Sequence, residues 1–314
     1  MNALMSLATR LNSFCARGLD VATAIRAVAA VPGISALELN YPQHLESLAE
    51  NALAALLTET GLRLTGLNLR FEGAEFAAGA FTNPRPATRA RAIRLAQDAV
   101  ELAGRHGASH VIIWLADDGF DYPFQVDFSR LWHDAITGFR QVAAHDPSIR
   151  VSVEYKPIEP RRFAVIRAMG EAMVAVYEVG MDNFGVTLDF CHALMAGEHP
   201  PAAAALALRQ GKLFGVHLND GHGRADDGLM VGSVHPWETL ELLALLRTEG
   251  YAGTIYFDTF PVREDPALEC ATNVATVRHY QRLLDRLDWA ALEAIRLAHD
   301  GVAARRLLDS TRGQ

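Results

Sequence analysis

Residues 150–157 read RVSVEYKP, a short β-branched run that ends in a carboxylate, a lysine and a proline. Three later stretches have the same form: FGVTLD at 184–189, LFGVHL at 213–218 and GTIYFD at 253–258. Each has the length and composition of a buried strand, and each ends near an acidic or histidine side chain. Between these stretches lie longer segments with the apolar spacing of helices. The pattern predicts strands that alternate with helices.

The same alternation extends toward the N-terminus. We predict four further strands at about 7–14, 35–41, 62–69 and 109–115. A helix over 86–106 begins with Pro86 and stops at Gly107, and one over 236–249 begins with Pro236 and stops at Gly250. Eight such units in one chain predict an α/β fold of the (β/α)8 TIM-barrel type. The alternative is an open doubly wound sheet. Such a sheet usually has a glycine-rich phosphate loop after its first strand, and this sequence has none at that position.

We assign residues 1–285 to a catalytic barrel and residues 286–314 to a C-terminal helical extension. Trp289, Leu292, Ile295 and Ala298 recur there at a spacing close to the helical period. The extension either covers its own barrel or contacts a partner subunit, and the sequence leaves both open.

Composition excludes several classes of protein. Of the 314 residues, 50% are hydrophobic and 21% are charged, as in a soluble globular protein. A net charge of −8 does not indicate the positively charged surface that binding to nucleic acid or an anionic membrane requires. The cysteines at 15, 191 and 270 are widely spaced, so we expect neither a zinc knuckle nor a disulfide framework. The N-terminus lacks the pattern of a signal peptide, and we expect a cytoplasmic protein without a membrane span.

Polar residues at the carboxyl ends of barrel strands face the mouth of the barrel. Glu154, Asp189, His217 and Asp258 lie at the ends of four successive predicted strands. Any of these aspartates could instead cap the next helix, and a lone histidine could be a core residue. Their coincidence on four strands predicts a site for Mn²⁺, with Mg²⁺ or Co²⁺ as alternatives, because the donors are oxygen and nitrogen atoms without a thiolate.

Other polar residues near the predicted mouth carry weaker signals. Lys156 lies two residues after Glu154 and therefore points to the same side of the strand. His222, Asp226 and Asp227 lie in a glycine-rich loop, which is either solvated or supplies further ligands. The candidate substrate contacts are Trp114, Asn68, Asn219 and His222, together with Asn12, Asn40 and Arg70 at the ends of the first three strands.

Taken together, four motifs resemble a known superfamily. They are Glu154-x-Lys156-Pro157, Asp189-x-x-His192, His217-x-Asn219-Asp220 and the loop ADDGLMVGS at 225–233. Their order, over about residues 7–280, resembles that of the xylose-isomerase-like sugar isomerases and epimerases. The first motif is similar to xylose isomerases, and the others are more similar to L-rhamnose isomerases.

The resemblance implies roles for these residues. Glu154, Asp189, His217 and Asp258 would hold one divalent metal ion, and His192 and Asp226 would belong to a second metal site. Lys156 would stabilise charge on the substrate oxygen, which makes Lys156, Glu154 and Asp258 the candidate catalytic residues. We expect one or two ions per subunit, with Mn²⁺ preferred.

Two departures from the family pattern are visible in the sequence. Gly228 stands where relatives carry a further acidic ligand, so the second metal is weakened or absent unless Asp227 substitutes. No histidine is found at the ends of the second and third predicted strands, where xylose isomerases place a ring-opening pair. This second departure argues against xylose as the substrate.

The resemblance implies an aldose–ketose isomerase that acts on a free, non-phosphorylated monosaccharide, in a homo-oligomer of two or four subunits. Alternatives on the same metal site are a ketose 3-epimerase and a keto-glycoside lyase or deglycosylase. A sugar-binding barrel without catalysis is the alternative outside enzymes. Lys156, and Asp258 in place of a second glutamate, favour the isomerase over the epimerase. The sequence does not decide between hydride transfer and an ene-diol route.

Overall fold

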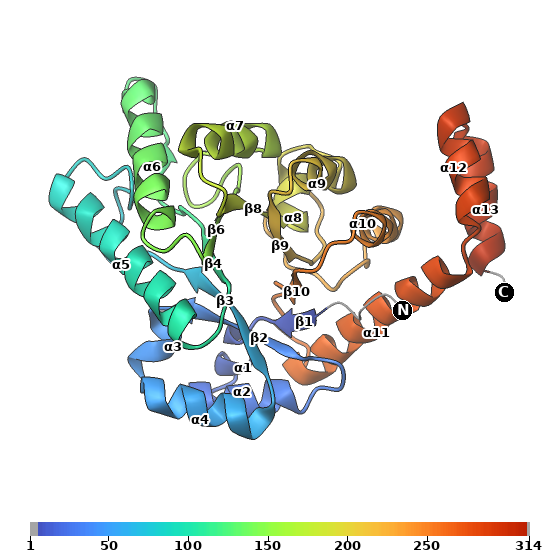
Figure 1. The fold of residues 1–314 in the computed structure, drawn as a ribbon, viewed down its shortest axis with the longest axis horizontal. Coiled ribbons are helices and arrows are strands. Elements are labelled where there is room, and N and C mark those ends of the chain that lie inside the picture. Colours follow the sequence, from blue (N-terminus) through green and yellow to red (C-terminus); the bar gives the residue numbers. More distant parts are fainter. Residues whose placement is uncertain (1–5, 313–314) are drawn as a thin grey trace.

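The computed structural model describes residues 6–312. Eight parallel strands form one sheet in the order β1-β10-β9-β8-β6-β4-β3-β2, which curls into a barrel (Figure 1). The strands are β1 (Ser6–Thr9), β2 (Ala36–Tyr41), β3 (Arg63–Leu69), β4 (His110–Ile113), β6 (Arg150–Glu154), β8 (Phe184–Asp189), β9 (Leu213–His217) and β10 (Thr254–Phe257). Between β1 and β2 the backbone N–H of Ser35 donates to Leu7 at 3.1 Å. The predicted (β/α)8 fold is confirmed.

Helices surround the barrel and cover its apolar strands. They are α1 (Asn12–Cys15), α2 (Val21–Ala29), α3 (Gln43–Glu46), α4 (Glu50–Thr60), α5 (Pro86–Arg105), α6 (Phe128–Ala143), α7 (Met169–Val179), α8 (Phe190–Met195), α9 (Pro200–Arg209), α10 (Pro236–Thr248), α11 (Pro266–Arg286), α12 (Trp289–Ala298) and α13 (Gly301–Arg312). Prolines at the first turns of α5, α9, α10 and α11 fix the helix starts without losing a hydrogen bond.

The interior of the barrel contains a chain of polar contacts. His110 Nε2 and the Ser152 hydroxyl are 2.7 Å apart, and Ser152 lies 2.7 Å from the Thr187 hydroxyl. Gly215, on the neighbouring strand, leaves room for this chain, because a Cβ there would lie 2.5 Å from Thr187 Oγ1. Buried polar groups are normally hydrogen-bonded, and these contacts provide partners for the polar side chains inside the barrel, below its mouth.

Most predicted strands agree with the structure within one or two residues, but the first does not. β1 ends at Thr9, and the chain turns at Leu11 into α1, so Asn12 begins a helix instead of ending a strand. The backbone N–H groups of Phe14 and Cys15 donate to Leu11, which closes this turn. The structure also contains a small antiparallel sheet of β5 (Gly119–Phe120) and β7 (Phe163–Ala164), which the sequence did not reveal.

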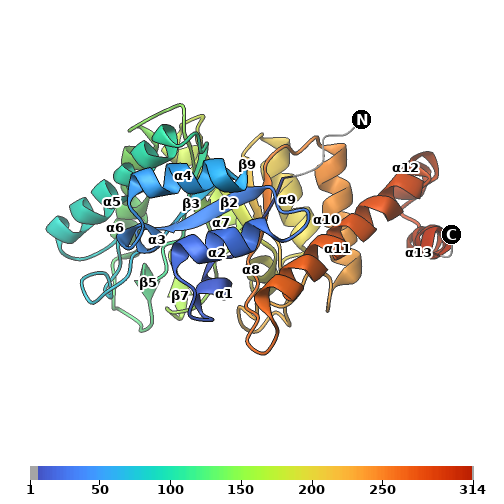
Figure 2. The same cartoon turned by 90° about the horizontal axis from the view of Figure 1, so that it is seen from below.

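The C-terminal extension is helical, as predicted, and forms α12 and α13; the last two residues of the predicted range lie outside the described part. Figure 2 shows these helices at one end of the molecule, beyond α10 and α11. Trp289 donates to the carbonyl of Leu284 at 3.1 Å, and Arg305 lies 4.9 Å from the Trp237 ring of α10. No helix within residues 6–312 is long and apolar enough to cross a membrane.

Candidate metal centre

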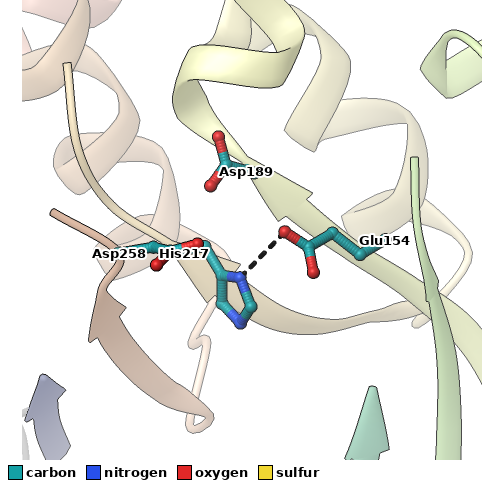
Figure 3. A group of neighbouring side chains, drawn as sticks. All are labelled: Glu154, Asp189, His217 and Asp258. Carbon is teal, nitrogen blue, oxygen red and sulfur yellow. Dashed lines mark hydrogen bonds and ion pairs between the residues drawn. The ribbon is translucent and has the colours of Figure 1, made fainter. Parts of the chain in front are cut away.

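Four strand ends bring their side chains to one point at the mouth of the barrel. Glu154, Asp189, His217 and Asp258 each offer a ligand atom, and these atoms all lie within 4.8 Å of one another. All four side chains are buried, and Figure 3 shows them converging from their separate strands. The pairing of β8 with β9 sets Asp189 beside His217, which places the two donors at the same level. The structure thus brings together the four side chains that the sequence places at the ends of successive strands.

Asp189 both faces this cluster and caps a helix. Its Oδ1 accepts the backbone N–H of His192 at 2.9 Å, which starts α8, and its Oδ2 accepts a hydrogen bond from Asn219 at 3.0 Å. Asp258 has no capping role, because Asp265 caps the following helix α11. The carboxylate of Asp258 pairs with Arg10 at 3.3 Å, and its Oδ1 receives no hydrogen bond.

A second cluster adjoins the first and shares Asp189. Asp189, His192 and Asp226 also place one ligand atom each within 4.8 Å of one another. His192 Nε2 lies 3.2 Å from Asp226 Oδ2. Asp227 is not a member, because its carboxylate accepts the backbone N–H of His222 instead. The second cluster therefore has three donors from the described residues.

The loop that carries Asp226 is held by Asp220. One oxygen of Asp220 accepts the backbone N–H groups of Val234 and His235, each at 2.8 Å, and the other accepts that of Gly221. The Asp220 and Leu229 backbones also pair as an antiparallel bridge. Asp220 is fully buried, so this loop is fixed at both ends.

Gly228, the departure from the family pattern, is explained by its contacts. Its φ of +54° lies in the left-handed region, and a Cβ there would lie 2.3 Å from the Phe260 ring. Phe260 donates its backbone N–H to the Gly228 carbonyl at 2.8 Å, which holds the two together. A fourth acidic ligand does not fit at this position without moving Phe260.

Lys156 lies between the two clusters and the cavity. Its ammonium group is 2.9 Å from Asp226 Oδ2 and 3.1 Å from Glu159, and it lies 5.1 Å from the Trp114 ring. Burial would lower its pKa, but Asp226 and Glu159 outweigh burial and raise it. Lys156 is therefore a cation at neutral pH.

The charged side chains of the two clusters shift one another's pKa values. Burial would raise the pKa of Glu154, but His217 and His192 outweigh burial and hold it at about 2. Burial would lower the pKa values of both imidazoles, but the surrounding carboxylates raise that of His217 to about 10 and that of His192 to about 9. Burial raises the pKa of Asp189 to about 7. Without a metal ion, the carboxylates are balanced by protons on the imidazoles.

The donor set fits a divalent cation. Buried Nδ1 of His192 and Oδ1 of Asp226 have no hydrogen-bond partner in the described structure, and Oδ1 of Asp258 has only the ion pair with Arg10 at 3.3 Å. Buried polar atoms without partners are uncommon and often mark a missing ion. Three carboxylates and an imidazole, without a thiolate, suit Mn²⁺ or Mg²⁺ better than structural zinc.

A cavity of about 240 Å³ opens beside the clusters. Glu154, Lys156, His192, Asp226 and Asp258 line one side of it, and Arg10, Asn12, Asn40 and Arg70 line the other. Trp114 and Phe260 also line the cavity. Lys156 and Glu154 share this wall, as their two-residue spacing predicted.

Three predicted substrate contacts lie elsewhere. Asn68 is buried and donates to Glu38 at 3.3 Å. Asn219 is fully buried, donates to Asp189 and to the carbonyl of Asp258, and accepts from Cys191. His222 is exposed. None of the three lines the cavity, whereas Trp114, Asn12, Asn40 and Arg70 do.

Sequence reasoning missed four residues around the site. Arg10 pairs with Asp258, Glu159 pairs with Lys156, and Glu38 lies 3.8 Å from His217 Nε2. His44 Nε2 lies 2.5 Å from Asn12 Oδ1, so a histidine reaches the site from α3, the helix that follows β2, and not from the end of the strand itself.

The chain was compared with known proteins. Residues 25–287 match the family model described as xylose isomerase-like TIM barrel. The chain is 29% identical over 231 residues to a xylose isomerase from Thermus thermophilus, which covers 71% of this chain and 59% of that enzyme. The chain thus spans less than two thirds of the length of this relative.

Two solved structures share the fold. A xylose isomerase domain protein from Alicyclobacillus acidocaldarius superposes with a TM-score of 0.69 at 20% identity, covering 90% of this chain and 100% of that one. A D-tagatose 3-epimerase-like protein gives a TM-score of 0.71 at 16% identity, covering 90% and 98%. Because the family model matches most of the chain, the protein belongs to the xylose isomerase-like TIM-barrel family.

Proposed function

We propose that the protein is a metal-dependent aldose–ketose isomerase that acts on a free monosaccharide. One observation carries this proposal: Glu154 and Asp258, two of the four side chains that can hold a divalent ion, line the same small cavity as the ammonium group of Lys156. A barrel that only binds a sugar has no need of a cation next to a metal site. The xylose isomerase from Thermus thermophilus supports the same reaction class.

Glu154, Asp189, His217 and Asp258 would hold the ion. Bound there, a divalent ion would supply Lewis acidity to the carbonyl and hydroxyl oxygens of the substrate. Lys156 would donate a hydrogen bond to the substrate carbonyl oxygen and stabilise negative charge as it forms. Asp226 and Glu159 keep Lys156 charged and hold it at the cavity wall.

Residues behind the cavity keep this arrangement in place. Asn219 joins Asp189 to the backbone of Asp258, so we assign it a positioning role in place of a substrate contact. In the second cluster, His192 and Asp226 would hold a further ion more weakly, because residues 6–312 supply three donors in all and Lys156 pairs with Asp226.

The presence of Lys156 favours isomerisation over epimerisation. An epimerase removes and returns a proton at one carbon and needs two bases, one on each side of the substrate. Here the two groups at the ends of β6 and β10 are Glu154 and Asp258, and Arg10 pairs with Asp258. The lysine supplies charge stabilisation instead of a second base.

The first test combines metal content with substrate conversion. We would measure metal in the purified protein, then aldose–ketose conversion over a panel of pentoses, hexoses, deoxyhexoses and their acids, with Mn²⁺ and with a chelator. We expect metal-dependent conversion that falls about 10²- to 10³-fold in Lys156→Ala while metal content is unchanged.

Arg94→Gln, an exposed change on α5, is the matched control and should behave as the wild type. Bound metal with epimerisation in place of isomerisation would reject the reaction class. A protein that retains no divalent ion would reject the proposal as a whole.

A further inference from the structure

The two walls of the cavity differ in chemistry. The wall built from residues at and after the ends of β6, β8, β9 and β10 carries the carboxylates of Glu154, Asp226 and Asp258 and the imidazole of His192. The opposite wall, built from residues after the ends of β1, β2 and β3, carries Arg10, Asn12, Asn40 and Arg70, and among the described residues Glu72 is the one carboxylate that lines it. Glu72 is exposed at the rim. The cavity therefore presents hydrogen-bond donors opposite the metal ligands.

Arg70 differs from the other two cations of the cavity. Arg10 pairs with Asp258 at 3.3 Å, and Lys156 pairs with Asp226 at 2.9 Å. The guanidinium of Arg70 lies 5.1 Å from the Trp114 ring, and within residues 6–312 it has neither an ion pair nor a hydrogen bond. Stacking on an aromatic ring orients a guanidinium but leaves its N–H donors free for another group.

Asn12 offers a second free donor on the same wall. His44 Nδ1 accepts the backbone N–H of Asn40 at 2.9 Å, so the hydrogen of this imidazole is on Nε2. Nε2 and the Asn40 amide both donate to Asn12 Oδ1, at 2.5 and 3.3 Å. The Asn12 side chain is therefore held by its oxygen, and its NH₂ group has no acceptor in the described part of the chain.

We propose that this wall is a carboxylate subsite centred on Arg70, with Asn12 and Arg10 beside it, and that the substrate is a sugar acid. The inference rests on the proposed function, since it names the class of monosaccharide that the isomerase converts. A planar guanidinium binds a carboxylate through two parallel N–H donors, which gives both affinity and orientation. The acid group would be held by this wall, with the hydroxycarbonyl end toward Lys156 and the metal ligands.

The test compares acids with neutral sugars of the same configuration. Binding of D-galacturonate and D-glucuronate to the Mn²⁺-loaded protein would be measured by calorimetry beside D-galactose and D-glucose. We expect the wild type to bind at least one acid about tenfold more tightly than its neutral partner. In Arg70→Gln this preference should fall to about threefold or less, while Mn²⁺ content stays the same.

Two further variants make the result specific. Arg70→Lys keeps the charge but not the planar fork, and we expect it to retain part of the preference. Arg94→Gln removes an exposed arginine of α5 and should retain all of it. Equal or tighter binding of the neutral sugars by the wild type, or an unchanged preference in Arg70→Gln, would overturn the subsite.

The same samples separate the two proposals. Metal-dependent isomerisation of neutral sugars without preference for acids would reject the subsite and keep the isomerase. Arg70-dependent binding of acids without isomerisation of any sugar in the panel would keep the subsite and reject the isomerase.

Discussion

Two histidines behind the opposite walls of the cavity lie in opposite electrostatic surroundings. On the β6–β10 wall, neighbouring carboxylates outweigh burial and raise the pKa of His217 to about 10. On the β1–β3 wall, burial, followed by Arg10 and Arg70, lowers the pKa of His44 to about 4. The surroundings of His217 favour a positive charge, so a bound cation would replace the proton of this imidazole, whereas His44 remains a neutral hydrogen-bonding group. This difference fits the proposal that one wall sets the reaction and the other sets the substrate.

The largest effect should follow from breaking the metal-binding wall. Glu154→Gln removes a ligand charge from the first cluster, and we expect loss of bound metal and a fall in kcat/KM of about 10³-fold or more. Metal analysis and kinetics on the same sample measure both. Glu72→Gln, on the opposite wall, is the control and should keep its metal; a Glu154→Gln protein that keeps full metal content would contradict the assignment.

The loop that completes this wall should be sensitive at Gly228. Gly228→Ala places a Cβ 2.3 Å from the Phe260 ring at a φ of +54°, so we expect a loss of about 1–3 kcal/mol in the free energy of unfolding. Gly250→Ala is a matched control, because its φ is +66° and nothing lies within 4 Å of the added atom.

Thermal or denaturant unfolding measures the difference between the two glycine variants. Phe260→Ala in the Gly228→Ala background should recover part of the loss. Equal destabilisation by the two glycine substitutions would show that the Phe260 contact is unimportant.

The neutral histidine of the other wall predicts a dependence of stability on pH. His44 has a pKa of about 4 in the folded state and about 6.5 when unfolded, so only the unfolded chain takes up its proton between these values. Its contribution is complete above pH 6.5 and is lost as the pH falls toward 4, by up to about 1.4 kcal/mol per pH unit. His44→Gln should flatten the stability profile in this window, whereas His133→Gln, exposed on α6, should leave it unchanged.

The smallest effect should come from Asn12. Asn12→Ala removes one donor from the substrate wall without touching a metal ligand, so we expect KM to rise about five- to tenfold with little change in kcat. Steady-state kinetics and metal analysis check this separation. A large fall in kcat with an unchanged KM would place Asn12 in the reaction wall instead.

The sequence predicted the metal-binding wall better than the substrate wall, for a physical reason. The four candidate metal ligands each stand at the end of an apolar run. The end of each strand therefore places its ligand at the mouth of the barrel: Glu154, Asp189, His217 and Asp258. Asn12 was assigned to a strand because its alternating pattern continues past Thr9, where the chain turns into α1. His44 was missed because its importance depends on Asn12, which lies 32 positions away.

Other features depend on contacts that no local pattern records. The pairing of Arg10 with Asp258 connects the segments that follow the first and the last strand of the barrel. The packing of Phe260 on Gly228 connects two loops. The strands β5 and β7 have two residues each, which is too short for periodicity to reveal. Asn219 was found by its motif, but its burial and its hydrogen bonds to Asp189 and Asp258 could not be read from its position in the chain.

The hydrogen bonds between Asp220 and the loop that carries Asp226 affect how fast a metal ion can leave the site. A loop pinned by a fully buried carboxylate opens only through local unfolding, which is slow compared with diffusion of a small ligand. We therefore expect ions to leave this centre over a long incubation and not within an ordinary mixing time. A brief chelator treatment would then leave the centre loaded, and a half-life for metal loss is more informative than an end point.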